Sequence, residues 1–170
     1  MQPLRAGLAL ALLAAVPALA QDDPVKTATA AMVAADGTAL GTLVLNATPA
    51  GVMIQGELAG LPAGPHGFHV HAAGACEPPF ESAGGPYNPA EAEHGFLTEG
   101  GPHAGDMTNI RAGEDGAVAI ELLNTFLALD PALFDDDGAA ILIHAMPDDY
   151  ATQPSGHAGD RIACGVIEPD

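Results

Sequence analysis

The sequence predicts an all-β protein, an eight-stranded antiparallel Greek-key β-barrel or sandwich with two long functional loops. Short apolar or alternating segments recur between turns rich in Gly, Pro and Asp, and no stretch after residue 20 shows a convincing helical period. We expect strands at 27–35, 40–48, 52–59, 67–72, 107–112, 117–123, 139–145 and 161–167. Asp115-Gly116, between the fifth and sixth of these strands, is typical of a tight hairpin turn.

Residues 1–20 are expected to be a secretory signal peptide that lies outside the fold. Arg5 precedes an apolar run over residues 6–16, and Ala18-Leu19-Ala20 provides a cleavage site of small residues. The run is too short for a membrane anchor, which needs about 20 apolar residues. Residues 21–170 would then form one exported, soluble domain, periplasmic or extracellular.

The exported chain is strongly acidic. The whole chain carries a formal charge of −18, and loss of Arg5 with the signal makes it −19, because all 22 acidic residues lie after residue 20. Such a charge makes nucleic acid and anionic membranes poor partners.

Two cysteines, Cys76 and Cys164, indicate a disulfide, since disulfides persist in exported proteins. The bridge would close a loop of 88 residues, for which chain entropy suggests about 4 to 5 kcal/mol before strain. The competing interpretation is that a cysteine is a soft copper ligand. It is weaker, because the chain offers a better set of ligands.

The expected strand 67–72 carries half of a metal site. Side chains alternate between the faces of a strand, so His69 and His71 project from one face while Phe68 and Val70 project from the other. Two imidazoles on one face suit copper, zinc, iron or nickel, and the pair alone does not choose between them.

Two segments, 74–106 and 146–160, are too long to be simple connections, and long loops of this kind are usually functional. The first contains His94, His103 and Asp106, and two histidines with one carboxylate make a three-ligand zinc set. The second begins just after His144 on its strand.

With these residues in view, the chain resembles the copper/zinc superoxide dismutases, in particular their exported bacterial branch, over essentially its whole mature length. The segments that carry the resemblance are His66 to His71, Ser82-Ala83-Gly84-Gly85, Tyr87-Asn88-Pro89, His103-Ala104-Gly105-Asp106, Asn109-Ile110, Ile143-His144, Pro147-Asp148-Asp149-Tyr150 and Gly159 to Val166.

The resemblance implies an enzyme that converts superoxide into oxygen and hydrogen peroxide with copper and zinc as cofactors. It implies copper ligands at His69, His71 and His144, and zinc ligands at His94, His103 and Asp106. Arg161 would stand beside the copper and guide the anionic substrate. Asp148 would link one copper histidine to one zinc histidine. His66 would be structural, bonded to backbone. The resemblance leaves open whether a copper chaperone is a partner, and the sequence does not decide between monomer and dimer.

One position departs from the family pattern. In members of the family, the histidine whose imidazolate bridges copper and zinc follows the Ser-Ala-Gly-Gly stretch. In this chain that position is Pro86, whose side chain has no donor atom for a metal. Tyr87 is a poor substitute as a phenolate ligand. His157 is an extra histidine that could approach the copper, although a lone loop histidine is more often exposed. We therefore expect dismutase activity that is retained but impaired. The alternative is a non-catalytic, exported copper/zinc-binding protein.

Overall fold

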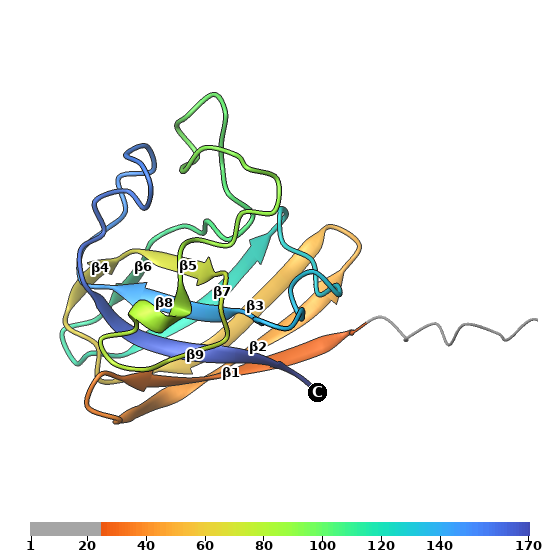
Figure 1. Ribbon diagram of the computed structural model, residues 1–170. Helices are drawn as coiled ribbons and strands as arrows, with labels where there is room; N and C mark the ends of the chain where they lie inside the picture. Colours follow the sequence, from red (N-terminus) through yellow and green to blue (C-terminus); the bar gives the residue numbers. More distant parts are fainter. Residues whose placement is uncertain (1–24) are drawn as a thin grey trace, which may run out of the picture.

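The computed structural model describes residues 25–170 (Figure 1). The expected signal peptide, and the first residues of the expected domain, lie outside this part of the chain. Within residues 25–170 no helix is long and apolar enough to cross a membrane.

The described chain forms a curled antiparallel sheet, as the sequence predicts, with a second small sheet beside it (Figure 1). The large sheet has seven strands in the order β5-β8-β9-β1-β2-β3-β7, and the small one pairs β4 with β6. The strands are β1 (Thr27–Ala34), β2 (Ala39–Thr48), β3 (Gly51–Leu58), β4 (Gly64–His66), β5 (Phe68–His71), β6 (Ile110–Ala112), β7 (Val118–Asn124), β8 (Ala140–His144) and β9 (Arg161–Pro169), with one 3₁₀ turn, η1 (Glu81–Ala83).

Residues 25–170 form one strand more than the sequence predicts. The additional strand is β4, which lies in a segment whose Pro and Gly residues indicate a break between strands. Pro65 is tolerated there, since β4 belongs to a two-stranded sheet in which both strands are edges. The predicted strand at 67–72 starts at Phe68 instead. Gly67 packs so closely on the second long loop that a Cβ atom there would lie 2.8 Å from the Ala158 Cβ.

Asp115-Gly116 does form a turn, in which the Gly113 N–H donates to the Ala117 carbonyl at 2.8 Å. The strands on either side of it, β6 and β7, pair with β4 and β3 respectively. The turn therefore connects the two sheets, and β6 is shorter than the predicted strand 107–112.

Strands β5 and β8 are buried on both faces, and this places the histidines. Phe68 and Val70 of β5 belong to the main apolar core, so the intervening His69 and His71 face the opposite side, as alternation requires. That side is covered by the two long loops, over residues 72–109 and 145–160 (Figure 1). The loops touch each other, since the Leu97 N–H donates to the Tyr150 carbonyl at 3.0 Å.

Candidate metal centre

Three histidine rings converge beneath the loops. His69 and His71 come from β5 and His144 from the end of β8, its neighbour in the sheet. Each offers a ring nitrogen, and these nitrogens lie within 4.8 Å of one another. The three side chains are at most 3% exposed, so water has little access to them.

Hydrogen bonds fix which nitrogen of each ring is free. His69 Nε2 contacts the Asp148 carboxylate at 2.8 Å, His71 Nδ1 the Gly84 carbonyl at 3.0 Å, and His144 Nδ1 the Gly159 carbonyl at 3.2 Å. Because these oxygens accept, the contacting nitrogens carry the protons. His69 Nδ1, His71 Nε2 and His144 Nε2 are left buried and without a hydrogen-bond partner. Three unprotonated nitrogens facing one point fit a copper ion well.

The second cluster joins two histidines to one carboxylate. The Nδ1 atoms of His94 and His103 lie 3.0 and 3.3 Å from the same Oδ1 atom of Asp106. The buried His103 Nδ1 makes no hydrogen bond despite this distance, as suits an atom oriented toward a metal. The other Asp106 oxygen accepts the N–H groups of Gly95 and His103, at 2.9 Å each.

A second grouping overlaps this cluster, because His69, His94 and Asp106 also bring ligand atoms within 4.8 Å of one another. His69 is excluded from the zinc-type set on chemical grounds. Its Nε2 already contacts Asp148, and its free Nδ1 belongs to the three-histidine group. The set of His94, His103 and Asp106 matches the two-histidine, one-carboxylate pattern of an open zinc site.

Asp148 lies between the two clusters. Its Oδ2 atom contacts His69 Nε2 at 2.8 Å, and its Oδ1 atom contacts His94 Nε2 at 3.0 Å. Asn109 holds it in place, donating from Nδ2 to the Asp148 carbonyl and accepting the Asp148 N–H at Oδ1, at 2.8 Å each. The carboxylate thus orients one ring of each cluster, as partners behind metal ligands commonly do.

Burial and charge shift the pKa values of these groups in opposite directions. Burial, aided by the Arg161 charge, lowers the pKa of His71 to about 3 and that of His144 to about 4. Burial opposes the positive charge on His94 too, yet hydrogen bonds to Asp106 and Asp148 raise its pKa to about 9. Burial would raise the pKa of Asp148, but its contacts with His69 and His94 hold it well below the usual range. The free rings of His71 and His144 are therefore neutral near pH 7 and ready to bind a metal.

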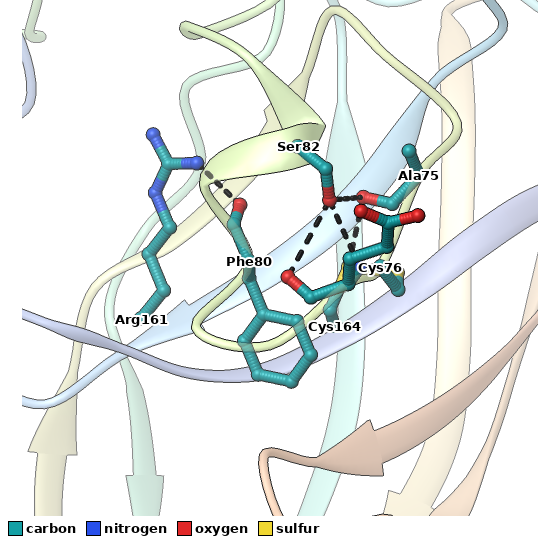
Figure 2. Close-up of a disulfide and its surroundings, with 7 residues drawn as sticks. Ala75, Cys76, Phe80, Ser82, Arg161 and Cys164 are labelled. Carbon is teal, nitrogen blue, oxygen red and sulfur yellow. Dashed lines mark hydrogen bonds between the residues drawn. A yellow bond between two sulfur atoms is a disulfide. The ribbon is translucent and has the colours of Figure 1, made fainter.

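A cleft of about 740 Å³ leads to the three-histidine cluster. His71 and His144 line it, together with Pro86 and Arg161. The Arg161 guanidinium donates to the carbonyls of Phe80 at 2.5 Å and Gly84 at 2.7 Å. Figure 2 shows the contact with Phe80 beside the Cys76–Cys164 disulfide. The Gly84 carbonyl accepts hydrogen bonds from both Arg161 and His71. One peptide group therefore positions both the guanidinium of Arg161 and the imidazole ring of His71.

The other residues that the sequence analysis singled out, His66, Tyr87 and His157, belong to neither cluster. Both ring nitrogens of His66 contact backbone carbonyls, those of His144 and Pro62, so neither is free. Tyr87 packs on the main core, and its pKa is raised by burial and by Asp130 and Asp135 in another loop. The His157 side chain is 79% exposed, lies 3.4 Å from Asp149, and is not among the residues that line the cleft leading to the three-histidine cluster.

Sequence reasoning missed Gln153, which holds the backbone of His94. Its amide oxygen accepts the His94 N–H at 2.8 Å, and its amide nitrogen donates to the His94 carbonyl at 3.0 Å. No sequence signal points to it, because the two residues are 59 positions apart and meet only through the contact between the loops.

A curled antiparallel sheet that holds two adjoining clusters of metal-ligating side chains under long loops defines a two-metal β-barrel protein. A sequence model of the copper/zinc superoxide dismutase family matches residues 39–167. The chain therefore belongs to the copper/zinc superoxide dismutase family, whose two metals fit the two clusters.

Relatives and solved structures agree with this family. The chain is 44% identical to "Superoxide dismutase [Cu-Zn] 1" of Aquifex aeolicus over 78% of its own length and 82% of that protein. A superoxide dismutase-like protein from Bacillus subtilis has a crystal structure that matches with a TM-score of 0.77 and 39% identity, over 81% of this chain and 96% of that one. A proline-to-histidine mutant of that protein matches with a TM-score of 0.77 and 38% identity, over 81% and 95%.

Proposed function

We propose that this protein is an exported superoxide dismutase with impaired activity, which converts superoxide into oxygen and hydrogen peroxide. Its copper would be held by His69, His71 and His144. The observation that carries the proposal is the set of three buried, unpaired ring nitrogens at the end of a cleft that also contains Arg161. Copper in such a site supplies one-electron oxidation and reduction, which is the chemistry that superoxide disproportionation requires.

Zinc would be held by His94, His103 and Asp106, behind the copper site. The contacts of Asp148 with His69 and His94 support a role for zinc in orienting a copper ligand. Zinc would make no direct contact with superoxide, since the residues that line the cleft include none of the three proposed zinc ligands.

Arg161 would guide superoxide to the open side of the copper site. The carbonyls of Phe80 and Gly84 hold its guanidinium in the cleft wall, so its positive charge is fixed without a paired carboxylate. This placement supports the enzyme over a storage protein, because a site that only stores a cation gains nothing from a second cation beside it.

We attribute the proposed impairment of dismutase activity to Pro86. This residue pairs with His71 through its backbone and lines the cleft, but its side chain has no atom that can bind metal or carry a proton. The proton that a bridging imidazole would deliver must then come from water. Pro86 is also what favours the alternative, a non-catalytic copper- and zinc-binding protein of the same exported class.

The deciding experiment is an assay of superoxide removal by the purified protein loaded with copper and zinc. The proposal predicts a rate that scales with bound copper and is lost in His144→Ala loaded under the same conditions. A copper-loaded native protein that removes superoxide no faster than the zinc-only protein would establish the non-catalytic alternative.

Export is proposed from three features together. These are the amino-terminal pattern of residues 1–20, the disulfide between Cys76 and Cys164, and the bacterial superoxide dismutase relatives. Mass spectrometry of the protein recovered from the periplasm should find an amino terminus at Gln21. Recovery of the protein from the cytoplasm with Met1 retained would contradict export.

A further inference from the structure

The outer part of the copper cleft carries two carboxylates. Glu81, on η1, and Asp160, just before β9, line the cleft that leads to His71 and His144, and both are exposed. Arg161 is the only Lys or Arg among the residues that line it. The cleft therefore has two negative charges and one positive charge.

The carboxylates are not neutralised by the arginine. The ion pairs formed within residues 25–170 all involve histidine, so neither Glu81 nor Asp160 pairs with Arg161. The guanidinium donates instead to the backbone carbonyl of Phe80 (Figure 2) and to that of Gly84. The Glu81 and Asp160 side chains make no hydrogen bond with any described residue, which leaves two unpaired charges facing the cleft.

The floor of the same cleft presents nitrogen lone pairs, which favour a cation. The Nε2 atoms of His71 and His144 are buried and unpaired, and these residues are 1% and 3% exposed. With Glu81 and Asp160 against Arg161, the charged side chains of the cleft sum to −1, and a cleft with net negative charge raises the local concentration of cations. Carboxylates in its wall and lone pairs on its floor thus favour the same ion.

We propose that Glu81 and Asp160 determine which ions the cleft admits, speeding the capture of hydrated copper(II) and slowing the capture of superoxide. The proposal rests on the proposed function, in which the three histidines hold copper. Copper(II) has two positive charges and superoxide has one negative charge, so the same carboxylates attract the first and repel the second. The chain would gain its metal efficiently at the expense of its rate as an enzyme.

The test is the rate of copper(II) uptake by the zinc-loaded protein, followed by stopped-flow absorption of nitrogen-bound copper at low and at physiological salt. We expect the native rate to fall with salt. Glu81→Gln and Asp160→Asn should each slow uptake by about two- to tenfold at low salt and flatten the salt dependence. Both side chains are exposed, so the substitutions should leave folding intact, and a thermal melt checks this.

Glu114→Gln is the matched control, because it removes the same charge from an exposed turn outside the cleft. It should take up copper at the native rate. In the copper-loaded proteins, Glu81→Gln and Asp160→Asn should remove superoxide faster than the native chain, while Glu114→Gln should not.

The inference is overturned if the cleft variants take up copper at the native rate, or if Glu114→Gln slows uptake as much as they do. Failure of the proposed function looks different. In that case the copper-loaded native protein would remove superoxide no faster than the zinc-only protein, whatever the rates of copper uptake. Failure of the copper site itself would show as equal copper binding by native protein and His144→Ala, with no nitrogen-bound signal specific to the native chain.

Discussion

At the scale of single residues, the state of the metal centre is determined by which nitrogen of each histidine carries a proton. The Gly84 and Gly159 carbonyls each engage the Nδ1 of one ring, and Asp148 engages the Nε2 of another. A carbonyl oxygen cannot donate, so the opposite nitrogens of His71 and His144 must carry lone pairs. In the metal-free protein these two nitrogens are therefore available to bind the proposed copper ion.

This arrangement has a consequence for stability against pH. Burial lowers the pKa values of His71 and His144 from 6.5 to about 3 and about 4 in the folded, metal-free protein. Between these values and pH 6.5 the unfolded chain binds more protons than the folded one. The free energy of unfolding should therefore fall as pH drops from 6.5 toward 4. Urea denaturation of the metal-free protein at several pH values measures this free energy. If NMR shows that the His71 and His144 rings titrate near pH 6.5, the prediction is wrong.

Pro86 provides the second residue-scale prediction. Pro86→His should place an imidazole beside His71, restore the bridge and raise the rate of superoxide removal by about tenfold or more, within the range of a positioned proton donor. The rate per bound copper is the measurement. His157→Asn is the control and should leave the rate unchanged, since His157 is exposed. An unchanged rate and copper spectrum in Pro86→His would mean that position 86 does not face the copper.

At the scale of elements, the sequence predicts the strand that presents His69 and His71 because alternation along β5 is a local property. Phe68 and Val70 do pack in the core, and the two long loops do cover the opposite face. The roles of Gly84 and Gln153 could not be predicted. Each depends on a backbone or amide group meeting a residue that is distant in sequence. Strand β4 was missed because its Pro and Gly residues suggest a turn wherever the sheet partner is unknown.

The disulfide provides a prediction at this scale. Cys76 and Cys164 attach the first loop to β9, and the same loop supplies the Phe80 and Gly84 carbonyls that hold Arg161. Cys76→Ser with Cys164→Ser should lower the free energy of unfolding by about 2 to 5 kcal/mol and weaken copper binding through His71. Urea midpoints and copper titration measure the two effects. An unchanged midpoint would show that the bridge adds nothing to the fold.

At the scale of the whole molecule, charge opposes the proposed reaction. The expected mature chain has only Lys26, Arg111 and Arg161 against 22 acidic residues. At about 0.15 M salt the Debye length is roughly 8 Å, so distant carboxylates are screened while Arg161, beside the metal site, is not. The attraction of superoxide should therefore depend almost entirely on this one residue.

The dependence of the catalytic rate on ionic strength tests whether local attraction by Arg161 outweighs the general repulsion by the carboxylates. The catalytic rate of the native protein should rise or change little with added salt, because salt screens the general repulsion more than it screens Arg161. Arg161→Ala should slow superoxide capture by about tenfold or more. A native rate that falls steeply with salt would reveal attractive steering from other residues.

In the proposed metal centre, copper and zinc occupy neighbouring sites that share no imidazole. Electron paramagnetic resonance of the copper(II)-loaded protein, recorded with zinc bound and after zinc removal, tests it most directly. We predict one tetragonal copper(II) signal from the three histidines that changes little when zinc is removed, because the two clusters share no ligand side chain and Asp148 contacts only one ring of each. A signal that shifts strongly on zinc removal would show that a shared ligand couples the metals and would contradict the two separate sites proposed here.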